Sequence, residues 1–194
     1  MQASIKTAGI IIATGILFGL ALSPAHAADS TDTVNATISG GNLSANPTAP
    51  SAMTPVVLDG VHAQSSTGTA AWTITNARGT STAWSLSASV VDFKSAAGSV
   101  DGDVRTLAAT NLVITPGTIT AGAGSDAAPT AAAVTMSNAG QTLVRSTTLG
   151  KGTFTLTPTF SLTVPANTFR SNFSGAIGDS PLNPYVSTIT FTIA

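Results

Sequence analysis

The chain has 194 residues, and only 8% of them are charged, against roughly 25% in an average soluble domain. It contains no cysteine and no glutamate, and its formal net charge is −1. A nucleic-acid binder needs many lysines and arginines to release phosphate counterions, which excludes that class. The missing cysteines exclude a thiol enzyme, an iron–sulfur protein and a disulfide-stapled mini-domain. Abundant threonine, serine and valine, with 43% hydrophobic residues, favour an all-β protein that can bury a core.

The N-terminus predicts secretion. Lys6 forms a minimal basic region, and an apolar stretch follows over residues 8–22. The run Pro24-Ala25-His26-Ala27 then supplies a breaker and a small-x-small site, the pattern of a signal peptide cut after its last alanine. A membrane anchor would need roughly 20 apolar residues, more than this stretch provides. We expect residues 1–27 to be a signal peptide and residues 28–194 to form one secreted domain without membrane contact after cleavage.

After the signal, apolar and polar residues alternate in short runs bounded by glycine, proline, asparagine and aspartate, the pattern of half-buried strands. Strands are predicted at residues 34–38, 55–58, 70–75, 83–90, 112–115, 133–136, 141–146, 152–164 and 185–193. The strands that contain Trp72 and Trp84 are predicted to form a hairpin across the turn at residues 76–79. Pro158 falls on the inward face of the longest run. Because proline cannot donate to a ladder, that strand is expected to bend or to change sheets there.

Each predicted strand has only one apolar face, so two sheets must pack those faces together. Short strands at this spacing predict a two-sheet antiparallel β-sandwich of the Ig-like, Greek-key type. The opposite faces carry mainly threonine and serine, which favour strands and keep the surface soluble without charge.

The aromatic residues divide into two groups. Trp72 and Trp84 are in phase with the apolar positions of their strands, which predicts that they lie in the core. Phe169 and Phe173 lie with Arg170 in a loop. We expect these two rings to form either an exposed contact surface or plugs that close one end of the sandwich.

Candidate catalytic and metal-ligating residues are sparse. Within residues 28–194 the single histidine is His62, beside the Asp59-Gly60 turn, and the chain has no Gly-x-Ser-x-Gly elbow, so a Ser–His–Asp triad is not predicted. One histidine without cysteine cannot make a zinc site. Asp101 and Asp103 have the chemistry to hold Ca²⁺, but the EF-hand spacing with its final glutamate is absent, which favours a solvated turn. We therefore expect no enzymatic activity, no catalytic residue, no cofactor and no bound metal.

Two sets of runs carry a resemblance. The first comprises Trp72-Thr73-Ile74-Thr75-Asn76-Ala77-Arg78-Gly79, then Ala83-Trp84-Ser85-Leu86-Ser87-Ala88 and Val91-Asp92-Phe93. The second is the C-terminal run from Tyr185, in which threonines alternate up to Phe191-Thr192-Ile193. In this order the chain resembles the WxL domain of bacterial surface proteins over essentially the whole of residues 28–194. The second motif departs from the family pattern, because phenylalanine and isoleucine stand where a second Trp-x-Leu is expected.

The resemblance implies a non-enzymatic protein at the cell surface, attached non-covalently to peptidoglycan or another cell-wall polymer, with other surface proteins as further partners. Carried over from the motif, the cell-wall-binding residues are Trp84, Leu86, Phe191 and Ile193. The alternative is that these four side chains fill the sandwich, while nearby loops and threonine faces recognise the polymer. A second hypothesis for function is a pilin-like or fibre-forming β-sandwich subunit, with the polar, proline-punctuated segment 29–55 as a donor strand.

Overall fold

The computed structural model describes residues 31–95, 103–147, 150–170 and 184–194. The chain divides into two units, Met1–Thr37 and Ile38–Ala194. In the first unit, residues 31–37 form no helix or strand, and their side chains are exposed. The predicted signal peptide and its cleavage site lie outside the described residues and stay predictions.

The second unit is built almost entirely from strands, and its described residues contain no α-helix. The strands are β1 (Leu43–Ala45), β2 (Gln64–Thr69), β3 (Trp72–Asn76), β4 (Trp84–Val90), β5 (Phe93–Lys94), β6 (Thr106–Leu107), β7 (Leu112–Thr115), β8 (Thr120–Ala121), β9 (Thr130–Ala131), β10 (Val134–Thr135), β11 (Gln141–Ser146), β12 (Gly152–Leu156), β13 (Thr159–Val164) and β14 (Ile189–Ile193). One short 3₁₀ helix, η1 (Ala109–Asn111), precedes β7. Every strand pair is antiparallel.

Two four-stranded sheets form one bent layer. Sheet A has the order β1-β3-β12-β8, and sheet B has the order β10-β7-β13-β2. The chain passes from β2 into β3 and from β12 into β13, and the pairing continues across the bend, with Leu156 opposite Trp72 and Thr159 opposite Thr69. The bend is at Pro158, whose carbonyl accepts a hydrogen bond from the Ala70 N–H at 3.3 Å. The predicted change of sheet at this proline is therefore confirmed.

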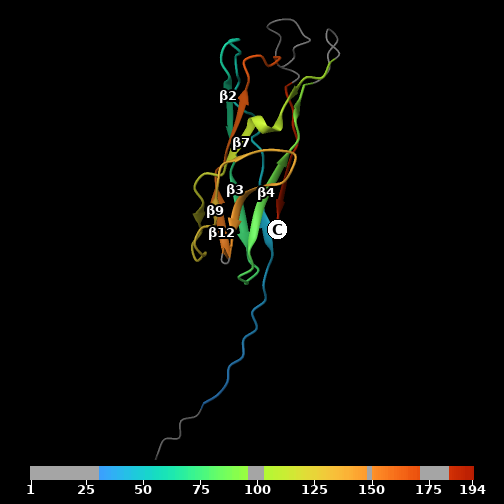
Figure 1. The fold of residues 1–194 in the computed structure, drawn as a ribbon. Helices are drawn as coiled ribbons and strands as arrows, with labels where there is room; N and C mark the ends of the chain where they lie inside the picture. Colours follow the sequence, from blue (N-terminus) through green and yellow to red (C-terminus); the bar gives the residue numbers. More distant parts are fainter. Residues whose placement is uncertain (1–30, 96–102, 148–149, 171–183) are drawn as a thin grey trace, which may run out of the picture. The chain divides into compact units, whose positions relative to one another are not determined.

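Sheet C, with the order β14-β4-β11-β9, provides the opposing layer of the sandwich. Two ring contacts connect it to sheet A: Trp72 lies 5.2 Å from Phe191, and Trp84 lies 6.2 Å from Phe154. The apolar side chains of sheets A, B and C form one buried cluster. Figure 1 shows β2 and β7 toward one end of the unit and β3, β4, β9 and β12 toward the other. The all-β sandwich prediction is confirmed, and strands β5 and β6 add a small two-stranded sheet.

The predicted hairpin between the two tryptophan strands is wrong. Strand β3 belongs to sheet A and β4 to sheet C, so the connection between them crosses the sandwich. Arg78 holds this connection by donating from Nε to Asn76 Oδ1 at 3.1 Å and from its guanidinium to the Thr82 carbonyl at 2.9 Å. The alternation of apolar and polar residues indicates which side chains point into the core. It does not indicate which strands pair with each other.

Other strand predictions differ from the structure in their bounds or fail altogether. Residues 34–38 and 55–58 form no strand, and Val34 and Val57 are 94% and 86% exposed. The last predicted strand is reduced to β14, although Val186 makes an isolated bridge with Lys94. Strands β7 and β11 have the predicted bounds, whereas β1, β2, β5, β6, β8 and β9 were missed.

Candidate functional site

The four residues of the two predicted motifs lie on neighbouring strands. Strands β4 and β14 pair so that Ile193 lies opposite Leu86 and Phe191 lies opposite Ala88. Beyond this pairing, Ser85 and Ala194 exchange backbone hydrogen bonds of 2.8 and 3.0 Å. The fold therefore brings together two segments that are about a hundred residues apart in the sequence.

Trp84 and Leu86 are core residues, 2% and 1% exposed. The indole N–H of Trp84 donates to the Gly150 carbonyl at 3.1 Å, and the buried Asn76 amide donates to the same oxygen at 2.8 Å. Phe191 and Ile193 are half-buried. A polymer on the surface cannot reach the two fully buried side chains unless the core opens, so recognition of a polymer requires other residues.

Gly150 makes the close approach to Trp84 feasible. Its φ is +99°, in the region that favours glycine, and an added Cβ would lie 2.5 Å from Ser146 Oγ and 2.9 Å from the Trp84 indole nitrogen. Asp126 fixes this backbone, because its Oδ2 accepts the N–H groups of Gly150 at 3.1 Å and Lys151 at 2.8 Å. The Lys151 ammonium lies 3.0 Å from the same oxygen. Hydrogen bonds from the Lys151 backbone and side chain hold the pKa of Asp126 below its ordinary value.

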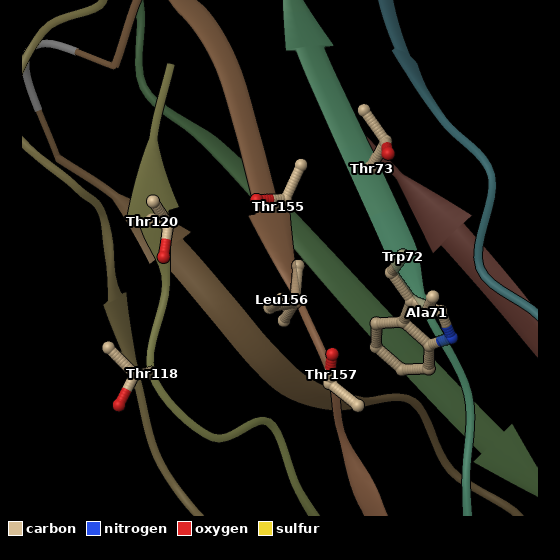
Figure 2. Close-up of a pocket in the computed structure, with 8 residues that line it drawn as sticks. All are labelled: Ala71, Trp72, Thr73, Thr118, Thr120, Thr155, Leu156 and Thr157. Carbon is tan, nitrogen blue, oxygen red and sulfur yellow. The ribbon is translucent and has the colours of Figure 1, made fainter.

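A hollow of about 370 Å³ opens between strands of sheet A. Hydroxyl side chains dominate its lining, which consists of Ala71, Trp72, Thr73, Thr118, Thr120, Thr155, Leu156 and Thr157. Thr155 lies opposite Thr73 on one neighbouring strand and opposite Thr120 on the other, so the three threonines form a row across β3, β12 and β8 (Figure 2). None of the lining residues is charged. We call this feature the threonine hollow.

Trp72 contributes to the wall of the threonine hollow, not to an open stacking face. Only 1% of its surface is exposed, and its indole N–H donates to the Thr48 carbonyl at 2.8 Å. The ring packs edge-on against Phe160 and Phe191. The core placement predicted for Trp72 and Trp84 is confirmed.

A second hollow, of about 310 Å³, lies beside the first motif. Its lining consists of Ala83, Trp84, Ser85, Thr142, Arg145, Ser146 and Ala194. It differs from the threonine hollow in carrying the guanidinium of Arg145, which favours an anionic ligand.

Phe169 occupies a half-exposed position, with 48% of its surface accessible. The Arg105 guanidinium carbon lies 4.1 Å from its ring centroid, and the Tyr185 hydroxyl donates to its carbonyl at 3.0 Å. Burial raises the pKa of Tyr185 against the opposing charge of Arg105. One face of the phenylalanine ring is therefore covered by a cation, while Phe173, predicted with it, lies outside the described residues.

His62 forms part of a turn. Asp59 Oδ1 accepts the backbone N–H groups of His62 at 2.7 Å and Val61 at 2.9 Å, and Asp59 Oδ2 lies 2.9 Å from His62 Nδ1. These hydrogen bonds, led by that from the His62 backbone, lower the pKa of Asp59 to about 2. In the part of the chain that the structure describes, no hydroxyl group bonds to the imidazole. The arrangement stabilises a turn and does not assemble a nucleophile with its base.

The described ranges contain no group of three or more histidine or acidic side chains placed to hold a metal ion. Asp103 forms an ion pair of 3.3 Å with Arg105, and Asp101 lies outside the described residues. The same ranges contain no helix with the length and apolar character needed to cross a bilayer.

No family model, no curated protein and no solved structure matches the chain. The resemblance to the WxL domain stays a prediction from the residues that carry it. Function must be inferred from the fold, the two hollows and the chemistry of the strand faces.

Proposed function

We propose that this is a secreted, non-enzymatic surface protein that binds non-covalently to the bacterial cell wall, with peptidoglycan as its ligand. The observation that carries the proposal is the threonine hollow, a concave site with hydroxyl groups from neighbouring strands and no charge. Small-ligand sites combine a concave surface with a few fixed polar groups. Threonine hydroxyls both donate and accept hydrogen bonds, which suits the sugar hydroxyl groups of peptidoglycan and the amide groups of the peptides that distinguish it from chitin.

The position of the threonine hollow supports this reading. Its central row lies on the outer faces of β3, β12 and β8, which the buried core holds in register through Phe154 opposite Ile74. Because these strands are paired, the hydroxyl groups are presented without large motions of the backbone. The WxL resemblance implies the same ligand class. Because Trp84 and Leu86 are buried, we favour the alternative in which threonine faces, and not the motif side chains, recognise the polymer.

Co-sedimentation tests the proposed ligand. The protein is expressed from the full chain in a secreting host, recovered from the cell exterior, and mixed with purified peptidoglycan, with chitin or with buffer alone. We expect it to pellet with peptidoglycan and to stay in solution in the other two mixtures. Equal amounts of protein in all three pellets would contradict the proposal.

Threonine-to-valine substitutions test the site. Thr155→Val and Thr120→Val keep the branched shape and remove one hydroxyl each, and a lost hydrogen bond of about 0.5–1.5 kcal/mol corresponds to an affinity roughly 2- to 12-fold lower. Thr163→Val, on the exposed face of β13, is the matched control and should bind as the wild type does. Arg145→Gln reports on the second hollow. Binding that is lost in Arg145→Gln and kept in Thr155→Val would place the ligand at the second hollow instead.

A further inference from the structure

The second hollow depends on an irregularity in strand β11. Between Thr142 and Val144 the pairing of β11 with β4 shifts, so that Leu143 and Val144 are both buried. Thr142 and Arg145 are therefore both exposed on the outer face of sheet C, although residues three apart in a regular strand face opposite sides. Bulges re-aim side chains in this way and are over-represented beside functional sites. Because of the shift, the threonine hydroxyl and the guanidinium line the same hollow.

The backbone that carries the guanidinium is held from both sides. Arg145 pairs with Ser85 of β4 and with Thr130 of β9, and its carbonyl also accepts a hydrogen bond from the Thr130 hydroxyl at 3.0 Å. Ser146, the next residue, is buried opposite Trp84. The base of the arginine side chain is therefore fixed before any ligand arrives, which lowers the conformational entropy lost on binding.

Arg145 is a cation that pairs with no carboxylate among the described residues. The ion pairs in that part of the chain are all made elsewhere, and they join His62 to Asp59, Arg105 to Asp103 and Lys151 to Asp126. Arg78 shows the contrast, because its guanidinium donates to Asn76 and to the Thr82 carbonyl. A guanidinium presents N–H donors in a planar fork that matches the two oxygens of a carboxylate or phosphate. The donors of Arg145 are available to a ligand that carries such a group.

Hydroxyl groups lie beside this guanidinium. Ser85 is opposite Arg145 on the neighbouring strand, and Thr142 borders the hollow with both of them. None of the described residues that line the hollow has an acidic side chain. The Ala194 oxygen at its border accepts the Ser85 N–H at 2.8 Å and so belongs to the backbone pairing. The hollow therefore combines one positive charge with hydroxyl donors.

We propose that the second hollow binds an oxyanion, a carboxylate or a phosphate group, through the Arg145 guanidinium, with the hydroxyls of Ser85 and Thr142 as further donors. Hydrogen bonds from arginine to such groups are charge-assisted, frequently bidentate and stronger than neutral ones. The volume of about 310 Å³ is at the lower end of the range for small-ligand sites, which suits a single acidic group with its neighbouring atoms. This site goes beyond the proposed function and does not depend on it, because none of the three residues lines the threonine hollow.

Two tryptophans allow one NMR spectrum to report on the two hollows separately. The chain has only two, Trp84 beside the second hollow and Trp72 in the wall of the threonine hollow, so ¹⁵N-labelled protein gives one indole signal for each. Acetate and inorganic phosphate are the probes for the two anion classes, and N-acetylglucosamine is the neutral control, all at constant ionic strength.

We expect the Trp84 signal to shift in a saturable way with acetate or phosphate, while the Trp72 signal stays in place. The probe that binds more tightly identifies the preferred anion class. A Trp84 signal that neither anion moves would contradict the proposal, as would one that N-acetylglucosamine moves equally far.

Two variants that lose the same charge separate the site from the net charge of the protein. Arg145→Gln removes the guanidinium, and Lys94→Gln removes an exposed positive charge from β5, in another sheet. For the more tightly bound anion, Arg145→Gln should lower the affinity about fivefold or more, which is ~1 kcal/mol, the upper range for an exposed ion pair. Lys94→Gln should bind as the wild type does, and both variants should keep its melting temperature. An unchanged affinity in Arg145→Gln, or equal losses in the two variants, overturns the proposal.

Discussion

The two faces of strands β3 and β12 share one backbone and differ in what they contribute. On the inner face, Ile74 and Phe154 are fully buried opposite each other. On the outer face, Thr73 and Thr155 occupy the next pair and line the threonine hollow. One pair of strands therefore supplies both the buried side chains that define the fold and, at the alternate positions on its other face, the hydroxyl groups available to a ligand. Substitutions on the inner face should lower the free energy of unfolding, whereas substitutions on the outer face should weaken only ligand binding.

The largest expected effect is in the core, where Trp84 of β4 packs against the inner face of β12. Trp84→Ala removes a buried ring and its hydrogen bond to the Gly150 carbonyl, and should lower the free energy of unfolding by about 3–5 kcal/mol. Chemical denaturation followed by tryptophan fluorescence or circular dichroism measures this. A loss well under 1 kcal/mol would show that the ring does not support the core. Any loss of wall binding by this variant must be read at a temperature where it is folded.

Gly150→Ala should come next, because it combines backbone strain with a steric clash. A left-handed conformation costs an ordinary L-residue about 1–2 kcal/mol, and the new methyl group would also collide with Ser146 and the Trp84 indole. Gly124→Ala is the matched control, with a φ of +75° and open space around its Cβ. The melting temperature of Gly150→Ala should fall clearly below that of Gly124→Ala. Equal decreases in melting temperature in the two variants would mean that the residues around Trp84 accommodate the added methyl group.

A smaller effect should appear on acidification. The pKa of Asp126 is held below its ordinary value of 3.8, first by the Lys151 backbone N–H and then by the Lys151 side chain. A carboxylate with a lowered folded pKa stabilises the protein above its unfolded pKa, and this contribution disappears as the pH falls through the folded value. The melting-temperature difference between wild type and Asp126→Asn should therefore be constant near neutrality and shrink below pH 3.8. A difference that does not change with pH would contradict this role.

The smallest effect on stability is expected on the outer face. Thr155→Val should change the free energy of unfolding by no more than about 0.5 kcal/mol, the range of ordinary surface substitutions. Its binding to peptidoglycan should nevertheless weaken, whereas Thr163→Val should change neither quantity. If Thr155→Val lowered the free energy of unfolding as much as a core substitution does, the proposed difference between the two faces would be wrong.

Much of the inner face could be predicted from alternation. The apolar buried positions of β3, β4 and β12 were assigned correctly, because a strand turns every second side chain toward the same side. Asn76, the buried last residue of β3, was instead predicted to lie in the turn. The bend at Pro158 was predictable from the missing N–H of proline. The neighbours of each strand were not, and β3 and β4 lie in opposite layers although they follow each other in the chain. Short strands such as β8, with two residues, carry too little pattern to be seen.

The candidate site shows the same division. Threonine faces were recognised in the sequence as a surface chemistry, but the threonine hollow exists because β8 pairs with β12, and Thr120 meets Thr155 across 35 positions of sequence. The proximity of Leu86 and Ile193 also depends on strand pairing. The family motif predicted that Trp84 and Leu86 bind the ligand, whereas in the structure both side chains are buried in the core.

By itself, the sequence determined the class of the protein: an all-β chain with few charged residues whose strands each have one apolar face, because composition and two-residue periodicity are local properties of the chain. Tertiary structure alone decided which strands are neighbours, which threonines share a hollow and which apolar segments, such as residues 55–58, form no strand. The reason is physical: hydrogen bonds between strands join backbones of any sequence, so register and neighbours follow from how the whole apolar surface is buried at once.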